Sequence, residues 1–201
     1  MRDFIIVGRP NSGKTLFALN FASFLGSKTV DVTSRSYDNL VTCKHYQIDE
    51  AKKALCGPMP HKTQSIQTII LSASVGKNSV NFKISDTCGI TEGIHTNVAI
   101  RKGMAQTIHQ MLNADFIFHV FDLSSIEKGV NYKHSAIDEE IYNYGISRMH
   151  YTLLANKIDL ISPKDLLSKL ITFFPKATII PISALLHNGF KEVKACVIRN
   201  I

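Results

Sequence analysis

The chain of 201 residues lacks any long apolar run, and this absence bears on its relation to membranes. No stretch approaches the ~18 consecutive apolar residues that indicate a membrane-spanning helix. The first three residues precede only four apolar residues, 4–7. That run is too short for a secretory signal peptide and fits a first β-strand. We therefore expect no membrane partner and a cytoplasmic location.

The cysteines lack the spacing of a metal site. There are four of them, and no two form a Cys-x-x-Cys pair or accompany a cluster of histidines. This pattern argues against a zinc site and favours reduced thiols in a cytoplasm. The cysteines are Cys43, Cys56, Cys88 and Cys196.

The sequence also lacks a basic tract, although its formal net charge is +7. A positive charge would suit an RNA or ribosomal partner. However, the 23 lysines and arginines are scattered, and they are adjacent only at 52–53 and 101–102. The charge is therefore compatible with such a partner but does not indicate one.

What the sequence does contain is a phosphate-binding motif in its proper context. Residues 8–15 read Gly-Arg-Pro-Asn-Ser-Gly-Lys-Thr and match Gly-x-x-x-x-Gly-Lys-Ser/Thr, the P-loop. An apolar strand-like run, 4–7, precedes the motif, and a helical segment, 16–25, follows it. The glycines let backbone N–H groups point at phosphate oxygens, and the helix N-terminus adds positive charge. Lys14 would reach the β- and γ-phosphates, and the Thr15 hydroxyl would ligate Mg²⁺. The expected nucleotide-binding residues here are Gly8, Asn11, Ser12, Gly13, Lys14 and Thr15.

A second motif indicates which base is bound. Residues 156–159 read Asn-Lys-Ile-Asp and follow the apolar segment 151–155, at the strand edge where α/β proteins bind ligands. The Asp159 carboxylate can accept two hydrogen bonds from guanine, whereas adenine lacks that donor pair. An unpaired buried acceptor costs roughly 1–3 kcal/mol, and this penalty would discriminate against adenine. Asn156 and Lys157 would brace the loop and cover the ring.

A third short segment supports the base site. Ser183 and Ala184 follow the strand-like residues 177–180. Small residues at that point would let a backbone N–H approach the guanine O6 atom.

Between these motifs, residues 86–89 read Asp-Thr-Cys-Gly after the strand-like run 80–84. The Asp86 carboxylate can hold Mg²⁺ through a water molecule. The Gly89 N–H can bond the γ-phosphate and so sense whether it is present.

Taken in this order, the motifs resemble those of a small GTPase domain. The spellings Gly-x-Pro-Asn-x-Gly-Lys-Thr and Asp-Thr-x-Gly-Ile are similar to the Era/EngA/tRNA-modification branch of the translation-factor-related GTPases. The resemblance spans essentially the whole chain. It implies a Ras-like α/β fold with about six strands, mainly parallel with one antiparallel edge strand, and helices on both faces. It also implies GTP hydrolysis to GDP as a molecular switch, linked to ribosome assembly or to tRNA and translation.

The resemblance further implies a switch I threonine that closes over Mg²⁺ and the γ-phosphate. Pro-Gly-x-Thr is common there, and residues 60–63 read Pro-His-Lys-Thr, so Thr63 is the candidate. The match departs from the family at His61, where glycine is usual. Thr68 is the first alternative, and Thr42 is the second.

Hydrolysis cannot use the glutamine of Ras-like proteins, because Ile90 occupies its position. The resemblance offers two other routes. Asn11 stands where related GTPases help to hold a potassium ion, and Glu92 stands where the tRNA-modification GTPases use an acid to organise the attacking water. Alternatively, Asn11 only tightens the loop and Glu92 is a solvated switch residue. We expect slow turnover without a cation or partner, because a missing charge donor accounts for roughly 10³–10⁵ in rate.

The alternation of strands and helices independently predicts an α/β fold, and we expect residues 1–201 to form one GTP-binding domain. Residues 132–144 are expected to form an exposed helix that carries three consecutive acidic residues, 138–140. The unusual part is an insertion at about 27–59, with an extra strand at 29–33 and a short helix at 48–55. A segment this long next to switch I is either an effector or nucleotide-dependent homodimer surface, or a structural elaboration.

Two other function classes compete with the hydrolytic switch. A GTP-dependent interaction module with little intrinsic hydrolysis is the alternative, and Ile90 is the residue that favours it. A P-loop kinase or ATPase is disfavoured by the guanine-specific residues 156–159.

Overall fold

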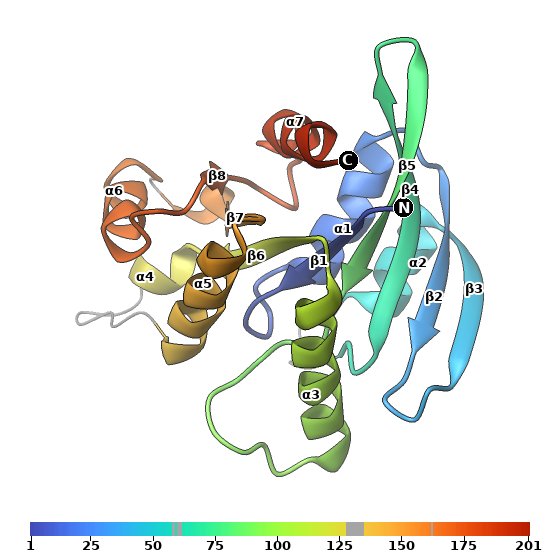
Figure 1. Ribbon diagram of the computed structural model, residues 1–201, viewed down its shortest axis with the longest axis horizontal. Coiled ribbons are helices and arrows are strands. Elements are labelled where there is room, and N and C mark those ends of the chain that lie inside the picture. Colours follow the sequence, from blue (N-terminus) through green and yellow to red (C-terminus); the bar gives the residue numbers. More distant parts are fainter. Residues whose placement is uncertain (58, 60–61, 128–134, 162) are drawn as a thin grey trace.

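The computed structural model describes residues 1–57, 59, 62–127, 135–161 and 163–201, and within these it forms one eight-stranded sheet (Figure 1). The strand order is β3-β2-β4-β5-β1-β6-β7-β8. The strands are β1 Asp3–Val7, β2 Thr29–Arg35, β3 Val41–Gln47, β4 Ile66–Val75, β5 Asn78–Asp86, β6 Phe116–Asp122, β7 Tyr151–Asn156 and β8 Ile179–Pro181. The helices are α1 Lys14–Phe24, α2 Ile48–Leu55, α3 Val98–Asn113, α4 Ser124–Glu127, α5 Ala136–Arg148, the 3₁₀ turn η1 Ile158–Leu160, α6 Pro163–Phe173 and α7 Phe190–Asn200.

The sheet has a parallel half and an antiparallel half. Strand β1 pairs in parallel with β5 and β6, and the parallel pairing continues through β7 to β8. Strands β5, β4, β2 and β3 pair antiparallel in that order. The expected Ras-like α/β fold class is confirmed, and the sheet is wider than about six strands because β2 and β3 extend its antiparallel side.

Two apolar cores lie on the two faces of the sheet. Helices α1, α2 and α7 cover one face, and α3, α5 and α6 cover the other (Figure 1). Strand β1 contributes to both, since its side chains alternate: Phe4 and Ile6 belong to the first core, and Ile5 and Val7 to the second. Residues 4–7 of β1 are buried on both faces in this way, which explains their uninterrupted apolar sequence.

The insertion forms a β-hairpin and a helix. The extra strand and the short helix that the sequence predicts are confirmed as β2 and α2. Strand β3 was not expected, because nearly all of its side chains are exposed and it carries no apolar alternation. Helix α2 packs against the first core through Ile48 and Ala51, and it ends at Leu55. The insertion therefore brings the residues that follow Leu55 to the same end of the sheet as the P-loop.

The prediction of an exposed helix at 132–144 is wrong in one respect. Residues 132–134 lie outside the described residues, and the helix α5 that follows buries Asp138, which is 1% exposed. The reason is a polar partner in the sheet: Nε2 of His119 on β6 lies 3.0 Å from Asp138 Oδ1. The other ring nitrogen of His119 lies 2.8 Å from the Tyr151 hydroxyl. None of the described helices is long and apolar enough to cross a membrane.

Candidate functional site

The P-loop connects β1 to α1 by a backbone path that excludes side chains at two positions. Gly8 has φ +140° and Gly13 has φ +99°, values that residues with a Cβ rarely adopt. A Cβ at Gly8 would also collide with the Val120 carbonyl oxygen, and one at Gly13 would collide with Asn156 Nδ2. The glycines are thus required by conformation and by close packing together.

Lys14, the first residue of α1, turns back over the loop. Its ammonium donates to the carbonyl oxygens of Gly8 at 3.1 Å and Arg9 at 2.7 Å. Burial lowers the pKa of Lys14 to about 8, and the nearby Asp86 carboxylate opposes this by favouring the charged form. A bound anion would favour the ammonium further, so the site is electrostatically suited to a phosphate group.

Two hydroxyls and a carboxylate meet beside Lys14. Thr15 Oγ1 donates to Asp86 Oδ2 at 2.6 Å and lies 3.1 Å from Thr63 Oγ1. Burial raises the pKa of Asp86 to about 6, and its second oxygen, Oδ1, is buried without a hydrogen-bond partner among the described residues. Hard oxygen ligands around an unsatisfied carboxylate oxygen fit Mg²⁺.

The alternatives for the switch I threonine lie elsewhere. Thr68 is on β4 and faces the Ser85 hydroxyl at 3.4 Å, and Thr42 is exposed on β3. Among the three threonines, Thr63 is the one that the structure brings to Thr15. Pro60 and His61, which belong to the predicted motif, lie outside the described residues.

The segment after β5 packs directly on the P-loop. A Cβ at Gly89 would lie 2.6 Å from the Pro10 nitrogen, and the Ile90 N–H donates to the Gly8 carbonyl at 3.2 Å. The Thr87 hydroxyl donates to the Ile6 carbonyl at 2.7 Å. These contacts place Gly89 at the edge of the same cavity as Lys14.

Asn156 joins the P-loop to the loop at 183–184. Its Nδ2 donates to the Ser12 carbonyl at 2.7 Å, and its Oδ1 accepts from the Ala184 N–H at 2.9 Å. From α1, Asn20 Nδ2 donates to the Ala184 carbonyl at 2.7 Å. Asn156 and Ser183 are buried, so this joint is shielded from water.

Lys157 and Asp159 complete this end of the site. Lys157 has φ +71°, and its ammonium pairs with Asp122 Oδ2 at 2.6 Å. Asp159 lies in the 3₁₀ turn η1 with its side chain exposed. The carboxylate is therefore free of the core and accessible to a ligand.

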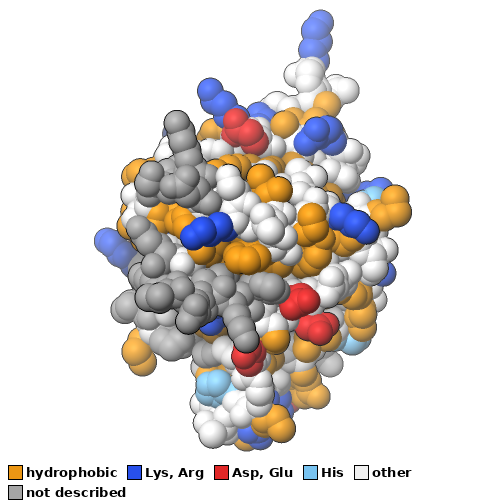
Figure 2. All heavy atoms as spheres, turned by 90° about the vertical axis from the view of Figure 1, so that its left-hand side faces the viewer, with side chains coloured by type: hydrophobic (Ala, Val, Ile, Leu, Met, Phe, Trp, Pro, Cys, Tyr) orange, Lys and Arg blue, Asp and Glu red, His pale blue; other side chains and the backbone are white. Residues whose placement is uncertain are grey.

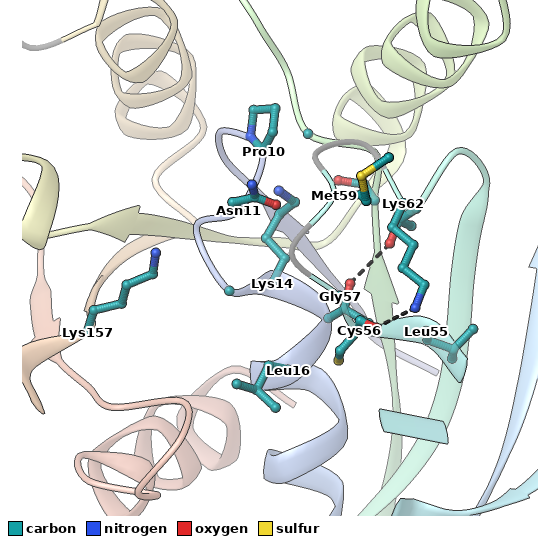
Figure 3. Close-up of a pocket in the computed structure, with 15 residues that line it drawn as sticks. Pro10, Asn11, Lys14, Leu16, Leu55, Cys56, Gly57, Met59, Lys62 and Lys157 are labelled. Carbon is teal, nitrogen blue, oxygen red and sulfur yellow. Dashed lines mark hydrogen bonds between the residues drawn. The ribbon is translucent and has the colours of Figure 1, made fainter. Parts of the chain in front are cut away.

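A cavity of about 420 Å³ lies over the P-loop (Figure 3). One side, which we call the P-loop wall, consists of residues 10, 11 and 13–16 of the P-loop and the start of α1, together with Thr87, Gly89 and Lys157. The predicted residues Asp86, Asn156, Asp159, Ser183 and Ala184 do not line it. The other side, the α2 wall, consists of Leu55, Cys56, Gly57, Met59, Lys62 and Thr63. Except for Thr63, the sequence motifs do not predict the α2 wall. Its only sequence signal is that Lys62 precedes Thr63 and that the insertion ends nearby.

Two predicted residues take different positions. Asn11 lines the cavity with φ +59°. Glu92 does not line the cavity: its Oε1 accepts from the Ser135 hydroxyl at 2.7 Å and from the Ala136 N–H at 3.1 Å. In this structure Glu92 thus caps the first turn of α5, an arrangement that the motif did not suggest.

Comparison with known proteins gives a consistent family. Residues 45–157 match the model of the family described as "50S ribosome-binding GTPase". Over 117 residues the chain is 26% identical to the GTPase Obg of Mycoplasmopsis synoviae (strain 53), a match that covers 57% of this chain and 27% of Obg.

Solved structures of GTPases share the fold. An Aquifex aeolicus Era variant bound to GDP·AlF₄⁻ superposes with a TM-score of 0.66 at 22% identity, covering 100% of this chain and 57% of Era. Era in complex with MgGDPNP and nucleotides 1506–1542 of 16S ribosomal RNA gives 0.67 at 23% identity, covering 99% and 56%. The G domain of the T. maritima FeoB iron transporter gives 0.59 at 14% identity, covering 100% and 98%. The chain thus spans little more than half of the Era chains and about a quarter of Obg.

Proposed function

Because the chain belongs to the 50S ribosome-binding GTPase family, we propose that residues 1–201 form a GTP-binding domain that hydrolyses GTP to GDP as a molecular switch. The observation that carries the proposal is that three motifs from separate strand ends, the P-loop, residues 86–89 and residues 156–159, all contribute lining residues to one cavity. The Asn156 amide hydrogen-bonds the P-loop and the loop at 183–184, and the oxygens of Thr15, Thr63 and Asp86 meet beside Lys14.

The phosphates of the nucleotide would lie on the P-loop. Backbone N–H groups at the start of α1 and the Lys14 ammonium supply positive charge, and Gly89 supplies an N–H for the γ-phosphate. The Lys14 ammonium would exchange the carbonyls of Gly8 and Arg9 for phosphate oxygens.

Thr15, Thr63 and Asp86 would hold Mg²⁺, which neutralises charge on the β- and γ-phosphate oxygens when it is bound. These three residues would position the metal beside the phosphates. Thr63 comes from the α2 wall and Thr15 from the P-loop wall, so a metal shared by both would draw the two walls together.

Guanine would be recognised at the other end of the cavity. Asp159 would accept from the base, and Lys157, whose ammonium pairs with Asp122, would cover the ring. A backbone N–H of the loop at 183–184 would approach the O6 atom. Asn156 fixes this loop to the P-loop, so that base and phosphates are bound at a set separation.

Catalysis of hydrolysis would depend on groups added to this basic site. Ile90 is buried and cannot orient water. Glu92 could do so only after leaving Ser135 and Ala136, and Asn11, which lines the cavity, would help to hold K⁺. We therefore propose slow intrinsic turnover that K⁺ or a partner stimulates.

A ribosomal or RNA partner is supported by the family description and by the rRNA bound to Era. On the face that Figure 2 shows, the described lysines and arginines are scattered singly and do not form one patch. A partner that binds this face would be engaged through shape and switch state more than through a basic patch. The insertion at about 27–59, which contains the hairpin β2–β3 and helix α2, is the candidate effector or homodimer surface.

The alternative, an interaction module that scarcely hydrolyses GTP, is favoured by Ile90 alone. Calorimetric titration with GDP, GTP and ATP in Mg²⁺, followed by single-turnover GTP hydrolysis in KCl and in NaCl, tests both functions. The switch requires tight guanine-nucleotide binding, no comparable ATP binding and measurable turnover. Faster turnover in KCl than in NaCl supports stimulation by K⁺. Tight binding without turnover in either salt supports the module, and equal binding of ATP refutes both.

A further inference from the structure

One lysine of the nucleotide cavity has no role assigned to it above. Three lysines line the cavity, and Figure 3 shows Lys14 between Lys157 on one side and Lys62 on the other. Lys62 comes from the α2 wall, next to Thr63. Among the described residues that line the cavity there is no carboxylate, so the cavity as a whole attracts anions.

The three lysines differ in their partners. Lys157 forms an ion pair with Asp122 at 2.6 Å, and Lys14 is buried near Asp86. Lys62, which is exposed, donates to the backbone carbonyl of Cys56, a neutral oxygen. Its positive charge is therefore not neutralised by the contact that holds it.

Gly57 leaves room beside the Lys62 side chain. The stem lies over Gly57, where a Cβ would come within 3.2 Å of Lys62 Cδ and Nζ. No side chain of Gly57 thus blocks the path from the Cys56 carbonyl into the cavity. A lysine carries its charge on a flexible four-carbon stem, which suits a group that changes partner.

The position of Lys62 fixes which part of a ligand it would meet. The next residue, Thr63, has its hydroxyl 3.1 Å from the hydroxyl of Thr15. Thr15 lies at the end of the cavity where the phosphates are proposed to bind. The Lys62 backbone thus lies beside the place proposed for the β- and γ-phosphates, on the other side of Lys14 from Lys157 (Figure 3).

We propose that Lys62 is a catalytic residue of the GTPase: when GTP binds, its ammonium leaves the Cys56 carbonyl and contacts the γ-phosphate and the β–γ bridging oxygen. The inference rests on the proposed function. In the reaction, the water oxygen bonds to the γ-phosphorus and the bond to the bridging oxygen breaks. The electron pair stays on the β-phosphate, and the proton of the water passes to the phosphate product or solvent. Lys62 keeps its proton and stabilises the leaving oxygen, in place of a charge supplied in trans.

Matched variants test this role. Lys62→Met keeps the length of the side chain and removes the charge, and Lys62→Arg keeps the charge. Lys53→Met is the control, since Lys53 is exposed on α2 and does not line the cavity. For each protein, the affinities for GDP and for GDPNP are measured by calorimetry, and the single-turnover rate of GTP hydrolysis is measured in the same buffer.

We expect Lys62→Met to lose about tenfold or more in GDPNP affinity or in hydrolysis rate, the effect of one charge-assisted hydrogen bond, with GDP affinity changed by less than about twofold. Lys62→Arg should retain most of both, and Lys53→Met should match the wild type. If Lys62→Met matches the wild type in both quantities while the wild type binds GDP and GDPNP, this inference alone is wrong. If the wild type binds neither nucleotide, the proposed function fails and the inference fails with it.

Discussion

The two walls of the cavity differ in how they are held. The P-loop wall is fixed by buried hydrogen bonds, of which those of Asn156 to Ser12 and Ala184 are the clearest. In the α2 wall, Gly57 and Lys62 are exposed, and the side chain of Met59 is 73% exposed. Local opening free energies are lowest where contacts are few and exposed, so the α2 wall is the part that can respond to a ligand. We infer that the P-loop wall recognises the ligand and that the α2 wall changes conformation when the ligand binds.

The largest effect is expected from the P-loop wall at Lys14. Lys14→Ala should abolish measurable GDP and GTP binding, a loss of at least ~100-fold, because it removes the charge-assisted bonds to the phosphates. Calorimetric titration measures this. The melting temperature serves as the control for folding, and nucleotide affinity within tenfold of the wild type would contradict the assignment of Lys14.

Asn156→Ala should remove the hydrogen bonds that connect the P-loop to the loop at 183–184. The change leaves the Ser12 carbonyl and the Ala184 N–H buried and unpaired, so the free energy of unfolding should fall by roughly 2–4 kcal/mol and nucleotide affinity should fall with it. Urea denaturation measures the stability. Thr42→Ala, on the exposed strand β3, should change it by less than about 0.5 kcal/mol. If the two changes lower the free energy of unfolding equally, the buried hydrogen bonds of Asn156 stabilise the protein no more than an exposed residue of β3 does.

Asp159→Asn should change the identity of the base and leave the phosphate contacts intact. An amide at this position offers a donor and an acceptor, so we expect weaker guanine binding and a shift in preference toward xanthosine nucleotides. Competition of XDP against GDP measures the shift. Guanine affinity equal to that of the wild type would show that Asp159 does not contact the base.

The reactivity of the Cys56 thiol tests the α2 wall, and here we expect a smaller effect. Burial, and next the nearby Asp86 carboxylate, raise the pKa of Cys56 to about 11. A thiol is protonated below its pKa, so the thiolate fraction of Cys56 and its rate of reaction with iodoacetamide should rise about tenfold per pH unit from pH 8 to 10. A Cys43→Ser background removes the exposed thiol that would react alongside it.

Because Cys56 lines the cavity, bound Mg·GDP should make the alkylation of Cys56 slower than in the nucleotide-free protein. Mass spectrometry of the modified peptide measures the rate with and without nucleotide. Alkylation of Cys56 that Mg·GDP does not slow would show that the α2 wall does not close over the ligand.

Much of the site around the P-loop could be predicted because its residues follow strands directly. Lys14, Asp86 and Asn156 come after apolar runs, and the carboxyl ends of parallel strands meet at one edge of a sheet. The structure brings them together, because Lys14 lines the cavity, Asp86 accepts from Thr15 and Asn156 donates to Ser12. Their roles with a nucleotide stay predictions. Thr63 was predicted from a degenerate motif, and its contact with Thr15 distinguishes it from Thr68 and Thr42.

The rest depends on partners distant in sequence. The burial of Asp138 requires His119, 19 residues earlier, and three consecutive acids give no sign of it. The capping of α5 by Glu92 joins residues 43 apart. The α2 wall depends on where α2 ends, which a helix prediction does not locate relative to the P-loop.

The Asn156 amide has a thermodynamic consequence. Asn156 donates to the P-loop at Ser12 and accepts from the loop at 183–184, where the base is proposed to bind. A ligand that orders either loop therefore also orients the amide for its contact with the other loop. Fragments of the nucleotide should then bind with mutual reinforcement: pyrophosphate should tighten the binding of guanosine, and guanosine should tighten that of pyrophosphate by the same factor.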